Sequence, residues 1–545
     1  MVRRICSVLI LSVSLCFSAV SGARAQPQRP KLLVGLVVDQ MRWDYLYRYA
    51  DRYSADGGFR RILTQGFSNE NTFIPYAPTV TACGHASIYT GSTPAVHGIT
   101  GNAWYDNHLN RVVYCTEDKK VKTVGSTSTA GEMSPANLLA STIGDELKLA
   151  TNFRSKVIGI ALKDRGAILP AGHAANGAYW YDGRTGNWVT STYYRNDLPA
   201  WVSDFNASKM VDKYYQQGWS TLYPLNTYVN STADEKEYEG KPFGTNAKGF
   251  PYDLKGMIGK NYGAIATTPH GNTMTLALAK AALKAEELGR DEFTDLLAVS
   301  LSSPDYVGHT FGPNSIEAED IYLRLDKELG EFFNFLDKEV GKGQYLFFIS
   351  ADHGVAHVPG FMKENKIPSG LFDDTKLVTE LNGHLGSLFG QQQLVLSIMS
   401  FQVHLNHKVI DSLKMDESAV SAAVIKFLKK RDDVARAFEL EKVAQTTLPA
   451  KIKDMVTLGY QPVRSGDIQI LIHPAVYDGG PTGTGHGVWN PYDAHIPLVW
   501  YGWKIPAGKS NHEVYMTDIA PTIAALLQIQ MPNGCLGKPI ESITR

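Results

Sequence analysis

The stretch Pro78-Thr79-Val80-Thr81-Ala82-Cys83-Gly84-His85 brings two hydroxyls, a thiol and an imidazole into eight consecutive residues. A threonine hydroxyl is a poor nucleophile at neutral pH, but a hydroxyl bound to a divalent cation can lose its proton and attack as an oxyanion. Cys83 offers a second nucleophile, but a reactive thiol needs partners that tune it, and the sequence shows no such His/Asn partnership. The stretch therefore predicts a metal-activated threonine, provided that metal ligands lie elsewhere in the chain.

Charged residues follow the ends of four apolar segments. These segments are rich in branched residues, as expected of strands buried on both faces of a parallel sheet, and span residues 31–38, 156–162, 296–301 and 345–350. The charged residues at or just beyond their ends are Asp39, Lys163, Asp305 and Asp352. Because ligands of open parallel sheets bind beyond the carboxyl ends of the strands, we expect one polar site assembled from distant segments.

Histidines near these positions complete a candidate metal site. The candidate ligands are Asp39, Asp305, His309, Asp352, His353 and His486. Each of them alone also fits a bland structural role, such as a helix N-cap or a turn. Together, however, three carboxylates and three imidazoles at one edge would be costly to bury without cations between them. Mixed Asp and His ligands favour zinc over manganese or magnesium.

Helical patterns alternate with the predicted strands. Residues 273–288 are rich in Ala and Leu, and one apolar face is traced by Ile321, Leu325, Leu329, Phe332, Leu336 and Val340. This alternation predicts an α/β fold with a doubly wound, mostly parallel sheet flanked by helices. Two regions, about 172–269 and about 359–481, break the pattern, and we expect both to be insertions that cap the sheet's C-terminal edge. The second should contain a helix over residues 417–430.

The first 25 residues have the features of a secretory signal peptide. Arg3-Arg4 precede an apolar run over 5–20, and Ala23-Arg24-Ala25 forms a small-residue cleavage site. The run is shorter than the ~20 residues that a bilayer span needs. Lipidation at Cys16 is the less favoured interpretation, because the residues before it make a poor lipobox. We expect an exported chain, 26–545, that is soluble and not inserted in the membrane.

Charge and cysteine content narrow the possible partners. The chain has 53 basic and 54 acidic side chains among 545 residues and no charged tract, so nothing points to nucleic acid or an anionic membrane as partner. Cys83, Cys115 and Cys535 remain after processing, an odd number. A Cys83–Cys115 bridge is possible but does not follow from the sequence. We expect a monomer that acts on small molecules.

A set of motifs carries a resemblance that covers the mature chain. In chain order these are residues 37–42, 78–91 with 93–99, 304–309, 350–354, 483–487 and 517–522. Together they resemble the alkaline phosphatase superfamily, and nucleotide pyrophosphatase/phosphodiesterases carry a similar segment around Thr81. The resemblance implies two Zn²⁺ ions per chain. One would be held by Asp305, His309 and His486, and the other by Asp39, Asp352, His353 and the nucleophile Thr81. It favours Thr81 over Thr79 and implies a phosphothreonine intermediate.

The substrate class depends on groups around the phosphate. Lys163 and Arg165 flank Asp164 directly after a predicted strand, so on an extended chain both would lie on the same side and could reach one phosphate. Together with Asn102 they resemble the phosphate-binding set of the Thr-nucleophile, phosphate-irrepressible alkaline phosphatases of Gram-negative bacteria. The implied function is hydrolysis of phosphate monoesters by an exported enzyme, in the periplasm or beyond.

Two alternatives remain open. The first is a zinc phosphodiesterase or nucleotide pyrophosphatase on the same core. Phosphodiesterase relatives typically share the Asn but lack the Lys/Arg pair. The second is a non-catalytic zinc-binding or glycan-binding exported protein that uses the aromatic-rich region 179–262. The presence of Thr81 together with all the candidate ligands argues against the second alternative, because such a protein has no need for a metal-bound hydroxyl.

Overall fold

A computed structural model describes residues 28–244, 249–391 and 393–544, so the predicted leader, residues 1–25, and Cys16 lie outside the described residues. The four predicted apolar segments form the centre of a large sheet, in the spatial order β10 (Tyr345–Ser350), β1 (Leu32–Val38), β9 (Asp295–Leu301) and β6 (Val157–Ala161). All three pairings are parallel. Every residue of these strands is buried, as their apolar composition predicts.

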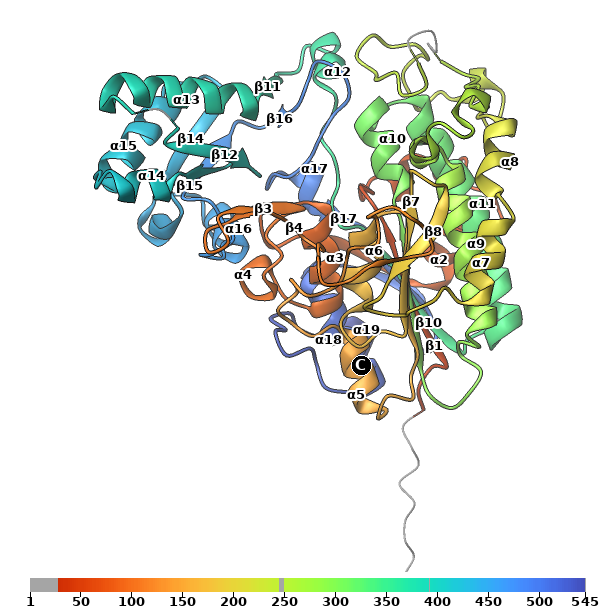
Figure 1. Cartoon of the computed structure of the whole chain (residues 1–545). Coiled ribbons are helices and arrows are strands. Elements are labelled where there is room, and N and C mark those ends of the chain that lie inside the picture. The colour runs from red at the N-terminus through yellow and green to blue at the C-terminus, as the bar shows by residue number, and fades with distance from the viewer. Residues whose placement is uncertain (1–27, 245–248, 392, 545) are drawn as a thin grey trace, which may run out of the picture.

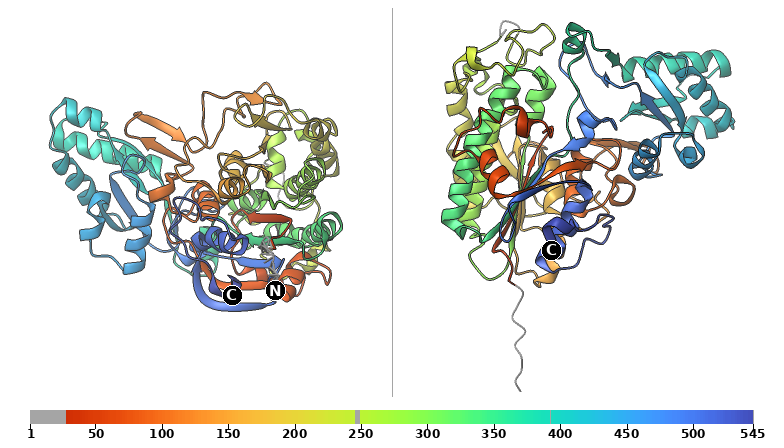
Figure 2. Two further views of the ribbon diagram at one scale, coloured as in Figure 1. Left: turned by 90° about the horizontal axis from the view of Figure 1, so that it is seen from below. Right: turned by 180° about the vertical axis from the view of Figure 1, so that it is seen from behind.

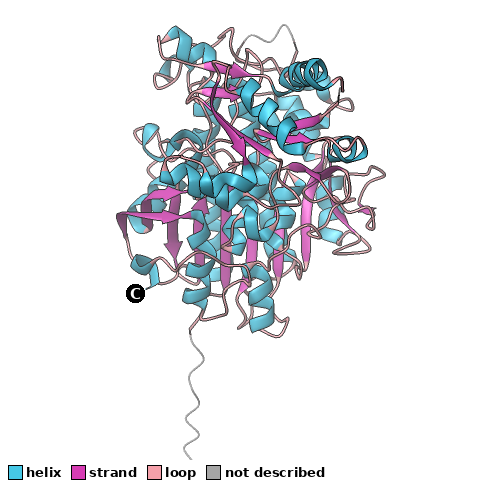
Figure 3. Ribbon diagram, turned by 90° about the vertical axis from the view of Figure 1, so that its left-hand side faces the viewer, coloured by secondary structure: helices cyan, strands magenta, loops and turns pink. Residues whose placement is uncertain are grey.

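Further strands extend the sheet at both edges (Figure 3). Beyond β6 lie β7 (Gly177–Asp182), β8 (Asn187–Ser191) and β5 (Thr123–Val124). Beyond β10 lie β18 (Leu498–Gly502), β2 (Phe67–Phe73), β17 (His495–Ile496) and β19 (Gly508–Tyr515). The start of the region 172–269 therefore differs from our expectation. It continues the central sheet, with β7 parallel to β6 and paired on its other side with β8, and Tyr179 and Trp180 of β7 are buried there.

Helices cover both faces of the sheet, which confirms the doubly wound α/β fold (Figure 1). One layer contains α2 (Gly58–Gln65), α7 (Ala200–Ala207), α8 (Met210–Gln217), α9 (His270–Ala285) and α11 (Ile316–Leu336). The opposite layer contains α3 (Thr81–Thr90), α5 (Ile143–Ala150), α6 (Asp164–Ala171) and α18 (Ile519–Leu527). The shorter helices include α1 (Tyr45–Arg48), α4 (Pro94–His97), α10 (Ser303–Phe311), α17 (Pro491–Ala494) and α19 (Glu541–Thr544). No helix of the described ranges is both long and apolar enough to cross a membrane.

The region 359–481 forms a lobe of its own beside the main body (Figure 2). Its sheet has the order β12 (Val395–Met399), β13 (Gln402–Leu405), β15 (Ile468–Ile472) and β14 (Val434–Glu439). The helices of the lobe are α12 (Pro359–Glu364), α13 (Asp374–Phe389), α14 (His407–Ser412), α15 (Glu417–Leu428) and α16 (Ala450–Gly459). Buried apolar side chains from its strands and from α13 and α15 form a separate core. Two short strands, β11 (Gly370–Phe372) and β16 (Val476–Asp478), pair where the chain enters and leaves the lobe.

A two-stranded hairpin, β3 (Ala103–Asp106) and β4 (Arg111–Tyr114), lies between the main body and this lobe. The Arg464 guanidinium of the lobe donates to the carbonyls of Gly98 and Asn137 at 2.6 and 2.7 Å. The Asn107 amide of the hairpin donates to the Val463 carbonyl at 3.2 Å. The first two contacts join the lobe to the main body, and the third joins the hairpin to the lobe. The Cys83 and Cys115 thiols nearby are free, so no bridge links them.

The helix that carries Thr81 packs directly on the central strand β1, and a glycine makes this possible. A Cβ atom at Gly35 would lie 2.3 Å from the Tyr89 hydroxyl of α3 and 2.7 Å from Cζ of Phe348. Both neighbours are fully buried aromatic side chains that have little room to move.

We therefore expect Gly35→Ala to overpack this contact and to lower the free energy of unfolding by about 1–3 kcal/mol. Chemical denaturation followed by circular dichroism measures this. Gly383→Ala in α13 is the matched control, because nothing lies within 4 Å of the added Cβ. Equal stabilities of the two variants would contradict the tight contact between β1 and α3.

Candidate active site

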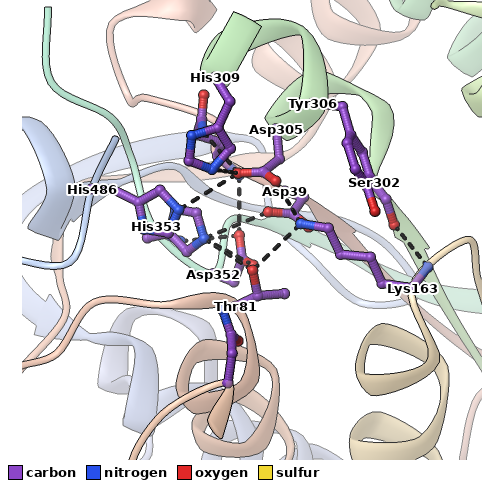
Figure 4. Close-up of polar contacts among 12 residues, drawn as sticks. Asp39, Thr81, Lys163, Ser302, Asp305, Tyr306, His309, Asp352, His353 and His486 are labelled. Atoms are coloured by element: carbon purple, nitrogen blue, oxygen red, sulfur yellow. Dashed lines mark hydrogen bonds and ion pairs between the residues drawn. The ribbon is translucent and has the colours of Figure 1, made fainter. Parts of the chain in front are cut away.

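The structure brings all the predicted metal ligands and Thr81 together at the carboxyl edge of the central strands (Figure 4). Asp39 directly follows β1, and Asp352 and His353 follow β10. Asp305 and His309 lie on α10, which starts where β9 ends, and His486 lies on the segment between the lobe and α17. The expectation that parallel strands deliver these side chains to one place is thus met by the fold.

Their ligand atoms form two overlapping groups. Within each group all the atoms lie within 4.8 Å of one another, and the groups are Asp305, His353, His486 and Asp39, Asp352, His353. His353 belongs to both groups. His309 belongs to neither, but its Nε2 lies 3.1 Å from Oδ1 of Asp305. The sharing of His353 differs from the division of ligands that the family resemblance implies, so the assignment of each ligand to one ion stays a prediction.

Backbone carbonyls orient the three histidines. The Nδ1 atoms of His309, His353 and His486 lie 2.7, 3.0 and 2.8 Å from the carbonyl oxygens of Thr484, Gly354 and Thr79, respectively. A carbonyl only accepts hydrogen bonds, so each Nδ1 carries the proton and each Nε2 is left with its lone pair. The Nε2 atoms are the ones that face the carboxylates. This is the arrangement that metal-binding histidines require.

The buried charges of the cluster are only partly neutralised. Asp39, Asp305 and Asp352 are buried, and the Lys163 ammonium lies 2.6 Å from carboxylate oxygens of both Asp39 and Asp305. Burial, and then the Asp305 and Asp352 carboxylates, raise the pKa of Asp39 well above its usual value. Burial also opposes ionisation of Asp305, but His309 and Lys163 outweigh it and hold its pKa well below the usual value. Three carboxylates and one ammonium leave a formal charge of minus two.

Two carboxylate oxygens show where further positive charge fits. Within the described part of the chain, Asp39 Oδ1 and Asp352 Oδ2 are buried and have no hydrogen-bond partner. Both lie close to Nε2 of His353, at 3.5 and 3.4 Å. Buried anionic oxygens without donors are costly unless a cation satisfies them. Aspartate oxygens and imidazole nitrogens are ligands that zinc accepts, so the residues present fit a divalent cation.

Thr81 is the first residue of α3, and its hydroxyl faces the cluster. Its Oγ1 lies 3.4 Å from both His353 Nε2 and Lys163 Nζ. The helix N-terminus favours negative charge at this position. Thr79 instead donates its hydroxyl to the Val488 carbonyl at 2.8 Å. The Cys83 thiol lies against the Ile99 carbonyl, and burial raises its pKa, which is the opposite of what a nucleophilic thiol needs.

Lys163 and Arg165 do not lie on an extended chain, so this sequence-based expectation was wrong. Lys163 is the N-cap of α6, and Arg165 lies in the first turn of that helix. The helix starts here because the negative charge of Asp164 is stabilised by the helix dipole in the first turn. Lys163 reaches into the carboxylate cluster, whereas Arg165 Nη1 donates to the Tyr114 hydroxyl at 2.9 Å. Asn102 is close to Thr81, because its Oδ1 accepts the Ala82 amide at 2.9 Å.

Several residues that position the site were not predicted from the sequence. Tyr114 holds Arg165 and donates to Asp164 Oδ1 at 2.8 Å. Asp493 Oδ2 accepts the amides of Gly487 and Val488, and so fixes the segment that follows His486. Gln40 follows Asp39 and contacts two of the carboxylates. Gln40 lies within a quoted motif, but nothing in residue type or spacing indicated these contacts.

One side of the cluster is open to solvent. His309 has 40% of its side chain exposed and Tyr306 is 37% exposed, whereas Thr81 and the three aspartates are buried. The Tyr306 ring lies beside Lys163, with the ammonium 5.1 Å from the ring centroid (Figure 4). A small polar ligand can therefore approach the cluster from α10.

Comparisons with known proteins show the family to which the chain belongs. Residues 33–487 match the family model of type I phosphodiesterase / nucleotide pyrophosphatase. Three relatives are similar over nearly the whole chain. Alkaline phosphatase PhoV of Synechococcus elongatus is 51% identical over 99% of this chain and 100% of its own. A protein of Myroides odoratus named calcium-transporting ATPase is 52% identical over 98% of each chain. Alkaline phosphatase PafA of Elizabethkingia meningoseptica is 50% identical over 94% of each.

A solved structure is similar to the whole fold. The crystal structure of wild-type alkaline phosphatase PafA superposes with a TM-score of 0.93 at 49% identity and covers 95% of this chain and 99% of that chain.

The donor set generates a prediction about stability. Zn²⁺ added to metal-depleted protein should raise the midpoint of thermal unfolding, because a ligand that binds only the folded state stabilises it by about 2.7 kcal/mol at a hundredfold excess over its Kd. His353→Ala should remove most of the rise, since His353 belongs to both ligand groups. The exposed His108→Ala should keep it. A rise of the wild-type size in His353→Ala would contradict the site.

Proposed function

The chain belongs to the type I phosphodiesterase / nucleotide pyrophosphatase family of the alkaline phosphatase superfamily, and on this premise we propose that it is an exported alkaline phosphatase that hydrolyses phosphate monoesters. The observation that carries the proposal is the position of Thr81. Its hydroxyl lies at a helix N-terminus, 3.4 Å from the Lys163 ammonium and inside a cluster of carboxylates and imidazoles. Two relatives of about 50% identity are named alkaline phosphatases.

The proposed cofactors are two Zn²⁺ ions, held by Asp305, His309 and His486 and by Asp39, Asp352, His353 and Thr81. When bound, the ions would lower the pKa of the Thr81 hydroxyl and neutralise charge on the phosphate and on the departing oxygen. The protein supplies the arrangement of ligands. The carbonyls that orient the histidines support it, because they keep each Nε2 free for an ion.

Thr81 is the proposed nucleophile, and its attack on phosphorus would give a phosphothreonine that water then hydrolyses. Lys163, Arg165 and Asn102 are proposed to bind the non-bridging oxygens of the phosphoryl group that is transferred. Lys163 has three N–H donors, of which two are directed at Asp39 and Asp305. The third is directed at the Thr81 hydroxyl, 3.4 Å away, where the phosphate would bind. Catalysis would then rest mainly on positioning and on charge neutralisation.

The cationic side chains proposed to bind phosphate favour a monoester over a diester. A monoester dianion has one negative charge more to neutralise than a diester, and Lys163 and Arg165 would supply two cationic donors beside the two proposed ions. This supports the monoesterase over the phosphodiesterase or nucleotide pyrophosphatase, which remains the second candidate because of the family that the chain matches.

The name of the Myroides odoratus relative is compatible with the same chemistry. The terminal phosphate of ATP is held by one phosphoanhydride bond and, like a monoester, has a single substituent on its phosphorus, so a broad phosphomonoesterase would release it. A non-catalytic binding protein is disfavoured, since such a protein has no need for Thr81 within the ligand cluster. We also propose that the chain is exported to the periplasm of a Gram-negative bacterium and that it is a monomer.

Thr81→Ala should abolish hydrolysis of a phosphate monoester while metal analysis still finds both ions, because the six other ligands remain. Thr79→Ala is the control. It removes only a hydroxyl directed at the Val488 carbonyl and should keep most of the activity. Activity of Thr81→Ala near the wild-type level, or a greater loss in Thr79→Ala, would rule out the assigned nucleophile.

Arg165→Ala should distinguish the two esterase functions. Loss of one charged contact to the transition state should cost about 2–4 kcal/mol, or roughly thirty- to a thousandfold in kcat/KM for a monoester. The loss should be much smaller for a diester with the same leaving group, because a diester has one charge fewer to neutralise. Equal losses on the two substrates would favour the phosphodiesterase.

A further inference from the structure

Gln40 has a backbone conformation that is unusual for its residue type. Its φ is 66°, in the left-handed region, and the residue is 2% exposed. Residues other than glycine, asparagine and aspartate rarely adopt this conformation, and strained residues of this kind tend to occur at functional sites. Glycine would adopt the same backbone without strain. The presence of glutamine therefore indicates that its side chain is needed.

Both halves of Gln40 contact the candidate metal ligands. Its backbone N–H donates to Oδ1 of Asp352 at 3.1 Å, and its side-chain Nε2 donates to Oδ1 of Asp305 at 2.7 Å. Asp305 and Asp352 belong to different groups of ligand atoms. Gln40 thus links the two groups of ligand atoms by direct, buried hydrogen bonds.

A glycine on the facing helix makes room for the Gln40 amide. A Cβ atom at Gly308 of α10 would lie 1.8 Å from Oε1 of Gln40. Any larger residue at position 308 would displace the amide from Asp305. Because Gly308 directly precedes His309, the same turn of α10 provides a ligand and accommodates the side chain that orients Asp305.

We propose that Gln40 is a positioning residue that fixes the carboxylates of Asp305 and Asp352 relative to each other, and thereby strengthens the binding of the divalent cations that these ligands would hold. A neutral amide donor suits this role, since it orients an anionic oxygen without competing as a cation. The left-handed backbone directs the N–H and the amide to the two carboxylates at once. This inference rests on the proposed two-metal site.

The test compares two substitutions that separate the effect of the side-chain amide from the effect of the strained backbone at Gln40. Gln40→Met keeps the length of the side chain but loses the donor, and Gln40→Gly loses the donor and relieves the backbone. Both should bind zinc about 10- to 100-fold more weakly in competition with a chelator, which is the usual cost of losing an outer-shell partner. In the absence of metal, the thermal midpoint of Gln40→Gly should equal or exceed that of the wild-type protein, because glycine relieves the backbone strain. The thermal midpoint of Gln40→Met should not exceed that of wild type.

A matched control is available at Gln528. This exposed glutamine also has a positive φ, 51°, but it ends α18. Gln528→Gly should leave zinc affinity unchanged. If Gln40 had a purely structural role, Gln40→Gly would also leave zinc affinity unchanged, and that result would overturn the proposal.

Gly308→Ala provides a second, independent test. It should weaken zinc binding in the wild-type background by displacing the amide, and should cost much less in the Gln40→Gly background, where no amide remains to be displaced. Equal costs in both backgrounds would overturn the proposal. If wild-type protein binds no divalent ion, the proposed function falls together with this inference. If wild type binds two ions and the Gln40 variants bind them equally well, only this inference falls.

Discussion

The structure depends on the burial of three carboxylates close to one another. Three aspartates converge on one edge of the sheet, and a single ammonium, that of Lys163, lies between two of them. Burial makes this arrangement costly, as the raised pKa of Asp39 indicates. A cluster of this kind is stable only when cations and fixed donors satisfy it. The oriented histidines, the Gln40 amide and the donor-free carboxylate oxygens are all consequences of this requirement.

The two sides of the site are built on different parts of the fold. The metal-binding side follows β1, β9 and β10, all of whose residues are buried. The proposed phosphate-binding side is formed by the start of α6 and by the hairpin, because Asn102 directly precedes β3 and Tyr114 ends β4 and holds Arg165. The hairpin in turn contacts the lobe, because Asn107 donates to the Val463 carbonyl and the Arg464 guanidinium lies over the Trp104 ring.

Much of this could be predicted from the sequence, because apolar strands that end in charged residues have a simple physical signature. The four central strands and the convergence of Asp39, Asp305 and Asp352 follow from that signature. The prediction failed at Lys163 and Arg165, where a strand pattern gave no sign that a helix starts at once. It also failed for β7, whose aromatic residues resembled an irregular insertion. The role of Gln40 could not be predicted, since the sign of a backbone angle and the identity of a distant partner leave no trace in spacing.

The most direct test of the central claim is a crystal structure of the wild-type protein with anomalous diffraction data recorded on both sides of the zinc absorption edge. The account predicts two anomalous peaks within the cluster of Asp39, Asp305, Asp352 and the three histidines, with the Thr81 hydroxyl facing them. A single peak, peaks located outside this cluster, or a Thr81 side chain turned away from them would contradict it.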